Sequence, residues 1–232
     1  MNILITRPLI DSEDLMKQFF SMGHKIIHLP TLKISSANMD PVDPNNFDAF
    51  IFTSVNAVRN LILLNQDRDK PCFCVGAITE KIARQSGFTQ TFSAGGTINA
   101  LKNLILGSNA INKKSKIIYF CGDNITFDLD IELKKEGLKI KKIINYHSEK
   151  IVDLSDQNKK IIENYPPNVI FVYSSRSAQS FIEIVKNNSL YPLMTESKVM
   201  CISKKVAKLF ILDGWKKIEV FSPGEELLGL QR

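Results

Sequence analysis

The chain has 232 residues and a mass of 26.2 kDa, and its 44% hydrophobic and 23% charged residues are typical of a globular protein. Its 30 basic and 24 acidic side chains leave a net charge of +6, which is spread along the chain and carried mostly by lysine. Base recognition and bidentate phosphate binding favour arginine. The sequence therefore disfavours nucleic acid as a partner and allows an anionic small molecule. Its length accommodates one large domain or two small ones.

The cysteines and the N-terminus indicate the compartment. Four cysteines lie in or beside apolar runs, without the paired spacing of a zinc site or a disulfide framework: Cys72, Cys74, Cys121 and Cys201. We interpret them as reduced core thiols of a cytoplasmic protein. The N-terminal apolar stretch is too short for a signal peptide, and no run approaches the roughly 18 apolar residues of a membrane span. We therefore expect neither a membrane partner nor a metal site.

Short apolar, β-branched runs alternate with segments of helical period along the whole chain, which is typical of parallel α/β architecture. The predicted strands are 2–6, 25–29, 48–53, 72–76, 89–93, 116–121, 139–146, 168–174, 198–203 and 217–222. The predicted helices lie near 12–22, 55–64, 78–86, 97–106, 128–136, 156–164, 176–187, 204–212 and 224–230. Four glycines follow predicted helices, where a residue of positive φ ends a helix most easily: Gly23, Gly87, Gly137 and Gly214.

The sequence also contains an internal repeat. Three blocks align in the same order: 48–61 with 168–181, 75–88 with 202–215, and 92–95 with 221–224. The first copy continues with a strand–helix–strand unit that ends at Tyr146. The second copy lacks this continuation, and its equivalent lies at the start of the chain, over 1–30. Such a lone unit cannot bury both faces of its strands, so we expect it to complete the sheet of the second copy.

The repeat predicts two Rossmann-like, parallel-sheet α/β domains, one inserted in the other. The inserted domain spans 38–145, and the discontinuous domain combines 1–35 with 150–232. Two connecting segments, near 31–38 and 145–150, must then run side by side. Such a pair is typical of a hinge with a cleft beside it.

Candidate site residues follow the predicted strands, where open parallel sheets bind ligands near helix N-termini. They are Thr6, Arg7, Ser54, Gly76, Gly122, Ser174, Ser175 and Ser203. Singly, each serine or threonine is explained as an ordinary N-cap. Collectively, helix N-termini at one edge of both domains suit carboxylates or phosphates. Arg7 is equally consistent with an anion contact and with a surface salt bridge.

Motifs of common catalytic classes are missing from the sequence. It has no dinucleotide-binding glycine motif, phosphate loop, nucleophile elbow or paired-histidine zinc motif. The three histidines have no metal-ligand spacing, and we interpret His147 as an exposed hinge residue. Tyr146 ends the last strand of the inserted domain, so its phenol is predicted to emerge near the cleft, either as a functional group or as an amphipathic plug.

Taken together, these segments resemble the uroporphyrinogen-III synthase family over essentially the whole chain. The matching stretches are 5–8, 29–30, 51–58, 75–76 with Thr79, 87–88, Tyr146 and 173–178. The resemblance implies two α/β domains joined by a two-stranded connector. It also implies a monomeric cytoplasmic lyase of haem biosynthesis that needs no cofactor and receives its substrate from the upstream bilane-forming enzyme.

The reaction that the resemblance implies is the cyclisation of hydroxymethylbilane, a linear tetrapyrrole, to uroporphyrinogen III. The ring A hydroxyl leaves as water, and the substituted carbon of ring D attacks to form a spiro-pyrrolenine. This intermediate then fragments and closes again with ring D inverted. By the same resemblance, Tyr146 helps the hydroxyl to leave, whereas Ser54, Thr79, Ser174 and the Gly76 amide bind carboxylates. Ser203 to Val206 departs from the family's Gly-x-x-Thr-like turn, which puts the substrate contacts of that turn in doubt, although Lys204 or Lys205 could supply charge there instead.

Two other classes of function compete with this interpretation. One is a non-catalytic, two-lobed α/β protein that binds an anionic small molecule, which would share the cleft and the hinge. The other is a nucleotide-binding regulator, for which the sequence offers no phosphate loop. Composition and periodicity alone predict only a two-domain α/β protein with a cleft that suits an anion.

Overall fold

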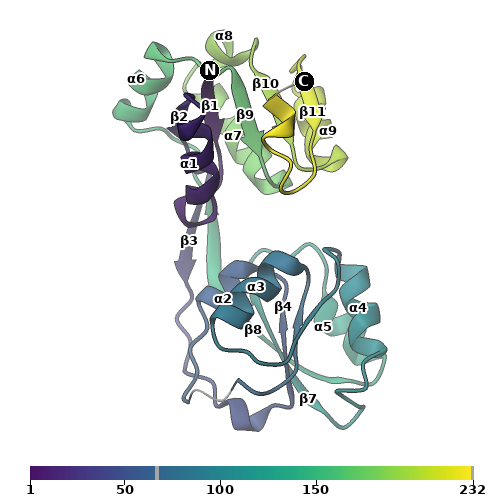
Figure 1. Ribbon diagram of the computed structural model, residues 1–232. Helices are drawn as coiled ribbons and strands as arrows, with labels where there is room; N and C mark the ends of the chain where they lie inside the picture. Colours follow the sequence, from purple (N-terminus) through teal and green to yellow (C-terminus); the bar gives the residue numbers. More distant parts are fainter. Residues whose placement is uncertain (66–67, 231–232) are drawn as a thin grey trace. The chain divides into compact units, whose positions relative to one another are not determined.

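The computed structural model describes residues 1–65 and 68–230. It consists of two compact units: unit 1 comprises Met1–Lys33 and Glu149–Arg232, and unit 2 comprises Ile34–Ser148. In Figure 1, unit 1 combines the purple N-terminal elements with the green to yellow ones, whereas unit 2 is blue to teal. The chain passes from one unit to the other within β3 (Leu32–Ser36) and again within β8 (Lys139–Lys150).

Unit 1 is built on a five-stranded parallel sheet of order β11-β10-β9-β1-β2. Its strands are β1 (Asn2–Ile5), β2 (Lys25–His28), β9 (Val169–Val172), β10 (Lys198–Cys201) and β11 (Ile218–Val220). Its helices are α1 (Glu13–Ser21), α6 (Asp156–Asn164), α7 (Ser175–Asn187), α8 (Tyr191–Met194) and α9 (Lys204–Leu212), with 3-10 turns η1 (Leu9–Asp11) and η3 (Leu228–Leu230). Alternate strand residues bury into separate clusters, Leu4 and Ile170 in one and Ile3 and Phe171 in the other. The sheet is therefore covered on both faces, as parallel sheets require.

Unit 2 is built on a six-stranded sheet of order β3-β8-β7-β4-β5-β6. Its strands β3 and β8 extend into unit 1. Its other strands are β4 (Ala49–Phe52), β5 (Cys72–Cys74), β6 (Thr91–Ser93) and β7 (Lys116–Gly122), and the strands from β8 to β6 pair in parallel. Its helices are α2 (Val55–Arg59), α3 (Ala77–Gln85), α4 (Ile98–Leu106) and α5 (Leu129–Lys135), with the 3-10 turn η2 (Pro44–Asn46). Phe50, Phe52 and Phe120 stack on one face, and Ile51 and Phe73 bury on the other.

The two sheets share one topology. The order β11-β10-β9-β1-β2 in unit 1 corresponds to β6-β5-β4-β7-β8 in unit 2, so each strand has an equivalent at the same place. The repeat found in the sequence is therefore confirmed, and the N-terminal β1 and β2 occupy the positions that β7 and β8 occupy in unit 2. The predicted fold class of mixed α/β with parallel sheets is likewise confirmed.

The four glycines that were predicted to end helices do so in the structure. Gly23, Gly87, Gly137 and Gly214 have φ of 80°, 99°, 87° and 89°, and each follows the C-cap residue of its helix, α1, α3, α5 or α9. In this left-handed region glycine avoids the steric penalty of a Cβ atom. None of the helices in the described part of the chain has the length and apolar character to span a membrane.

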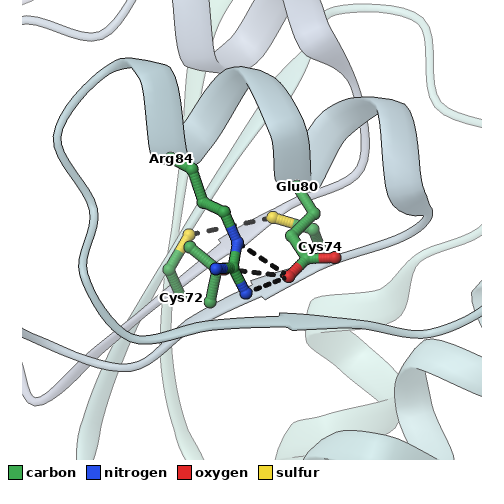
Figure 2. Close-up of polar contacts among 5 residues, drawn as sticks. Cys72, Cys74, Glu80 and Arg84 are labelled. Atoms are coloured by element: carbon green, nitrogen blue, oxygen red, sulfur yellow. Dashed lines mark hydrogen bonds and ion pairs between the residues drawn. The ribbon is translucent and has the colours of Figure 1, made fainter.

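All four cysteines are free and buried, as predicted. On β5, Cys72 and Cys74 point to the same face, with their Sγ atoms 3.8 Å apart (Figure 2). Burial raises the pKa of the Cys72 thiol well above its ordinary value, so it stays protonated and unreactive. Nearby, Arg84 donates two hydrogen bonds to Glu80, whose carboxylate also accepts from Thr91 and so ties α3 to the edge strand β6.

Two predicted helices are shorter in the structure. The helix predicted for 55–64 ends at Arg59, because the apolar residues after it adopt extended backbone: Val42 donates to the Ile62 carbonyl and accepts from the Leu64 amide. The helix predicted for 224–230 is reduced to η3: Gly224 has a φ of 88°, which excludes this position from a helix, and the Leu228 and Leu230 amides donate to carbonyls three residues back. In both places the apolar residues have the spacing of a helix, but the chain does not form the full helix that this spacing predicts.

Candidate active site

A cavity of about 150 Å³ lies at the carboxyl ends of β4 and β7, beside Tyr146 of β8, within unit 2. Its lining residues are Thr53, Ser54, Ile98, Tyr119, Gly122, Asn124, Ile125, Thr126, Phe127 and Tyr146. These described residues are uncharged, and their polar groups are hydroxyls, one amide and backbone. We call this cavity the tyrosine pocket, because two phenols contribute to it.

A β-bulge changes the face of the sheet on which Tyr146 lies. Along the β7–β8 pair, Cys121 is opposite Ile144 but Gly122 is opposite Tyr146, so one extra residue, Asn145, is inserted in β8. Regular alternation from Ile140 would place Tyr146 in the cluster of Ile140, yet Tyr146 packs with Ile143 on the other face. Asn145 is fully buried, and its Nδ2 donates to the Ala57 carbonyl at 2.7 Å, which holds the bulge in place.

Gly122 provides the surface on which the Tyr146 ring lies. A Cβ atom at position 122 would be 2.6 Å from Tyr146 Cζ and 2.8 Å from its hydroxyl oxygen, distances at which real Cβ atoms are not found. A side chain of any size would therefore displace the phenol. Glycine at the end of this strand thus allows the close approach of the ring.

The surroundings keep the Tyr146 phenol neutral. Burial raises its pKa, and hydrogen bonds from the Ser54 side chain and the Gly122 backbone oppose that rise without cancelling it. Burial also raises the pKa of Tyr119, whose hydroxyl is 3.1 Å from Thr53 Oγ1. Two protonated phenols therefore contribute to one uncharged pocket, where each can act as a hydrogen-bond donor.

The other predicted residues of unit 2 lie around helix N-termini. Ser54 caps α2, and its hydroxyl accepts from the Asn56 backbone N–H at 3.1 Å. Gly76 caps α3, and Thr79 is buried in the first turn of that helix; neither lines the tyrosine pocket. The structure thus brings Ser54, Gly122 and Tyr146 together and places Gly76 and Thr79 outside their pocket.

Thr6 and Arg7 follow β1 in unit 1. Thr6 is buried, and its hydroxyl donates to the Phe171 carbonyl at 2.8 Å, so it ties β1 to β9. The Arg7 guanidinium carbon lies 4.4 Å from the centre of the Tyr173 ring, a cation–π contact. Burial raises the pKa of Tyr173 and the nearby Glu226 carboxylate raises it further, whereas Arg7 lowers it.

The three predicted serines of unit 1 are at helix starts. Ser174 caps α7 and accepts from the Ser177 backbone N–H at 3.0 Å, and Ser175 is the first residue of that helix. Ser203 caps α9 and accepts from the Val206 N–H at 3.3 Å. The side chains of Ser174 and Ser203 therefore serve as N-caps, and both helices start at the same edge of the sheet, after β9 and β10.

Sequence reasoning missed several residues at the tyrosine pocket. Tyr119 was treated only as part of an apolar strand, although a phenol within a buried run needs a hydrogen-bond partner and so signals a polar neighbour. Next to the pocket, Asp123 was given no role and His147 was interpreted only as an exposed hinge residue; 45% of its side chain is exposed, and its Nδ1 is 3.2 Å from Asp123 Oδ2. Nothing in the sequence shows that these two residues meet, because the contact depends on the register of β7 and β8.

Comparison with known proteins identifies the family. A family model described as uroporphyrinogen-III synthase HemD matches residues 13–223. A search of curated protein sequences found no match. A solved uroporphyrinogen-III synthetase from Helicobacter pylori is similar over 99% of this chain and 98% of its own, at 17% identity and a TM-score of 0.67.

A mutant uroporphyrinogen III synthase from Thermus thermophilus is similar over 100% of this chain and 98% of its own, at 14% identity and a TM-score of 0.59. These two likenesses show a shared fold. The family model covers most of the sequence. The chain therefore belongs to the uroporphyrinogen-III synthase family.

Proposed function

We propose that this protein is a lyase that cyclises hydroxymethylbilane to uroporphyrinogen III, with loss of water and inversion of ring D. The observation that carries the proposal is the Tyr146 phenol, held on Gly122 beside Ser54 in an uncharged pocket. Membership of the uroporphyrinogen-III synthase family supports the same reaction. We further propose that the protein acts as a cytoplasmic monomer without a cofactor and takes its substrate from the upstream bilane-forming enzyme.

In the proposed first step, Tyr146 donates a hydrogen bond to the ring A hydroxyl as its C–O bond breaks. The hydroxyl gains a proton and leaves as water, while the ring A nitrogen gives up one proton, so Tyr146 ends the step protonated. The product is an azafulvene, which the substituted carbon of ring D attacks to form the spiro-pyrrolenine. A phenol whose pKa is raised by burial is protonated at neutral pH and suits this role.

The later steps require restraint more than acid or base. Ring D closes spontaneously without inversion unless the reactive ends are held in another geometry, and holding them is catalysis by positioning. The tyrosine pocket fits this requirement because Tyr146 is held by packing: it belongs to the cluster of Phe120 and Ile143, and its ring lies against Gly122. We propose that this rigidity selects the inverted product.

The substrate has two carboxylates on each ring, and we propose separate contacts for them in each unit. In unit 2 they are Ser54 and the start of α3 with Gly76 and Thr79. In unit 1 they are Arg7 with Thr6 before it, and the starts of α7 and α9 with Ser174, Ser175 and Ser203. Helix N-termini and a guanidinium are the groups that bind carboxylates most readily.

A coupled assay with hydroxymethylbilane tests the activity. The products are oxidised and separated by chromatography into type I and type III isomers. We expect type III to predominate and to rise with the amount of protein. Type I alone, formed at the rate of the buffer by folded protein, would reject the catalytic proposal and favour a non-catalytic protein that binds an anion.

Replacing Tyr146 tests its role. We expect Tyr146→Phe to lower kcat about 100-fold, at the lower end of the range for loss of a positioned proton donor, and to change KM less than about twofold. Tyr165→Phe is the matched control, because Tyr165 is exposed and belongs to unit 1. An unchanged kcat in Tyr146→Phe would remove Tyr146 from the mechanism.

A further inference from the structure

Asp123 holds the end of β8 through both its side chain and its backbone. Its Oδ1 accepts from the Ser148 backbone N–H at 3.1 Å, and its Oδ2 is 3.2 Å from His147 Nδ1. Its own backbone N–H donates to the Tyr146 carbonyl at 3.2 Å. One residue therefore contacts three consecutive residues of β8, beginning with Tyr146.

These contacts take over where the ladder between the two strands stops. The last registered pair of β7 and β8 is Gly122 with Tyr146, and β7 ends at Gly122. Asn124 completes the link, because its Nδ2 donates to Asp123 Oδ1 at 2.7 Å and to the Ser148 carbonyl at 3.3 Å. On the β7 side, the segment that follows the bulge is thus held by side chains instead of by the ladder, whereas its other side pairs with β3.

The Asp123 carboxylate is ionised at neutral pH. Burial would raise its pKa, but hydrogen bonds from Asn124, His147 and the Ser148 backbone outweigh that effect and lower it. Charge-assisted hydrogen bonds of this kind are stronger than neutral ones. Asp123 does not line the tyrosine pocket, whereas its neighbours Gly122 and Asn124 do.

We propose that Asp123 is a positioning residue for Tyr146: by clamping residues 146–148, it keeps the phenol on Gly122 and beside Ser54. The inference rests on the proposed function, because it assigns Asp123 a part in the same reaction without contact with the substrate. It goes beyond that function because the residue that fixes the position of Tyr146 lies outside the pocket. Loss of the Asp123 side chain removes the contacts that hold residues 147 and 148 on the β7 side, while β3 still pairs with β8. Small displacements of a reacting group lower rates strongly.

The test compares Asp123→Ala, Asp123→Asn and the control Asp128→Ala in the type III assay. Asp123→Ala is expected to lower kcat about tenfold with KM changed less than about twofold. Asp123→Asn should lie between Asp123→Ala and the unmodified protein, because the amide oxygen still accepts from Ser148. Asp128 is an exposed aspartate of the same unit, so Asp128→Ala removes the same charge and should stay within about twofold.

Combination with Tyr146→Phe separates positioning from general damage. If Asp123 acts through the phenol, Asp123→Ala should lower kcat less than about twofold once the phenol is absent. An equal loss in both backgrounds would overturn the inference, since Asp123 would then act independently of Tyr146. A normal kcat for Asp123→Ala in the otherwise unmodified protein would overturn it too.

A measurement without substrate keeps the inference separate from the proposed reaction. The chain has five tyrosines, so NMR of protein labelled with ¹³C at tyrosine Cζ gives few signals, and Tyr146→Phe identifies that of Tyr146. Asp123→Ala should shift or broaden this signal and leave those of Tyr165 and Tyr191, in unit 1, in place. An unmoved Tyr146 signal would overturn the inference. A moved signal in a protein that makes no type III product would reject the proposed function alone.

Discussion

The carboxyl edges of the two sheets begin alike and then differ. Ser54 after β4 and Ser174 after β9 hold equivalent places, and each caps the helix that follows. The neighbouring strand pair differs: β1 and β2 keep an unbroken register to Ile5 and His28, whereas β7 and β8 contain a bulge before Gly122 and Tyr146. The capping serines that the two copies share therefore serve the fold. The bulge, which only the β7–β8 pair has, lies at the site of the proposed chemistry.

Charge also distinguishes the two edges. The tyrosine pocket of unit 2 is lined by uncharged residues, whereas unit 1 has the Arg7 guanidinium over Tyr173 at its edge. An uncharged pocket suits a hydrogen-bond donor that must stay protonated, and a guanidinium suits a carboxylate. On this comparison, changes in unit 2 should affect kcat, and changes in unit 1 should affect stability or KM.

The largest effect is expected at Gly122. In Gly122→Ala, the added Cβ would stand 2.6 Å from Tyr146 Cζ, so the ring must move off its place. We expect kcat for type III formation to fall about 100-fold, because displacement of a reacting group by about 1 Å costs that much. Steady-state kinetics of the purified variant, with its fold checked by circular dichroism, measure the effect.

Gly107→Ala is the matched control for Gly122→Ala. Gly107 follows α4 in the same unit, and its Cβ would lie 3.3 Å from the Asn103 carbonyl oxygen, a tight contact that small shifts relieve. Its kcat should remain within about twofold of the unmodified value. If both variants lose activity equally, the close approach of Tyr146 to Gly122 is not what the reaction depends on.

Much of the fold is predictable because each strand here is a short apolar run covered on both faces. Ala49–Phe52 and Val169–Val172 are buried at all four positions, so their sequences read as unbroken apolar runs between helical segments. The repeat then arranges the strands into sheets. The helix predictions failed where apolar residues with helical spacing pack in an extended segment. After Arg59, for example, the chain pairs with Val42 instead of continuing a helix.

Less of the site is predictable, because its geometry depends on contacts between distant segments. Ser54, Gly122 and Tyr146 could be singled out from their places after strands and from family resemblance. The bulge at Asn145 could not, since only the register against β7 reveals the extra residue. The clamp of Asp123 follows from that same register, and so was hidden with it.

A second, intermediate effect is expected in unit 1, on stability alone. Asp213 accepts hydrogen bonds from Tyr191 and from Trp215 Nε1 and pairs with Lys186. Asp213→Asn removes the charge from this network, so we expect the free energy of unfolding to fall by about 2 kcal/mol. Trp215, the sole tryptophan, is buried in unit 1 and reports the change by fluorescence in urea. Activity per folded molecule should be unchanged. A loss of kcat would contradict the expectation that changes in unit 1 affect only stability or KM.

The pH dependence of this effect has a definite sign. Burial would raise the pKa of Asp213, but hydrogen bonds from Lys186, Tyr191 and Trp215 outweigh it, so the folded pKa lies below the ordinary 3.8. A lowered carboxyl pKa adds stability above the unfolded value, and that stability is lost as the pH falls through the folded value. The difference between the unmodified protein and Asp213→Asn should therefore be constant near neutral pH and shrink below about pH 4. A difference that persists unchanged at pH values below the folded pKa would exclude the carboxylate charge as its cause.

The smallest effect is expected at Arg7, where the comparison predicts a change in KM. Removing the guanidinium in Arg7→Gln takes away a proposed carboxylate contact distant in sequence from Tyr146, so KM should rise about fivefold while kcat changes less than about twofold. Arg7→Lys keeps the charge but loses the planar group over Tyr173, and its KM should rise less. Lys160→Gln, at an exposed position of the same unit, controls for net charge. A fall in kcat with KM unchanged would assign Arg7 to the chemical step. It would contradict the expectation that kcat depends on unit 2 and KM on unit 1.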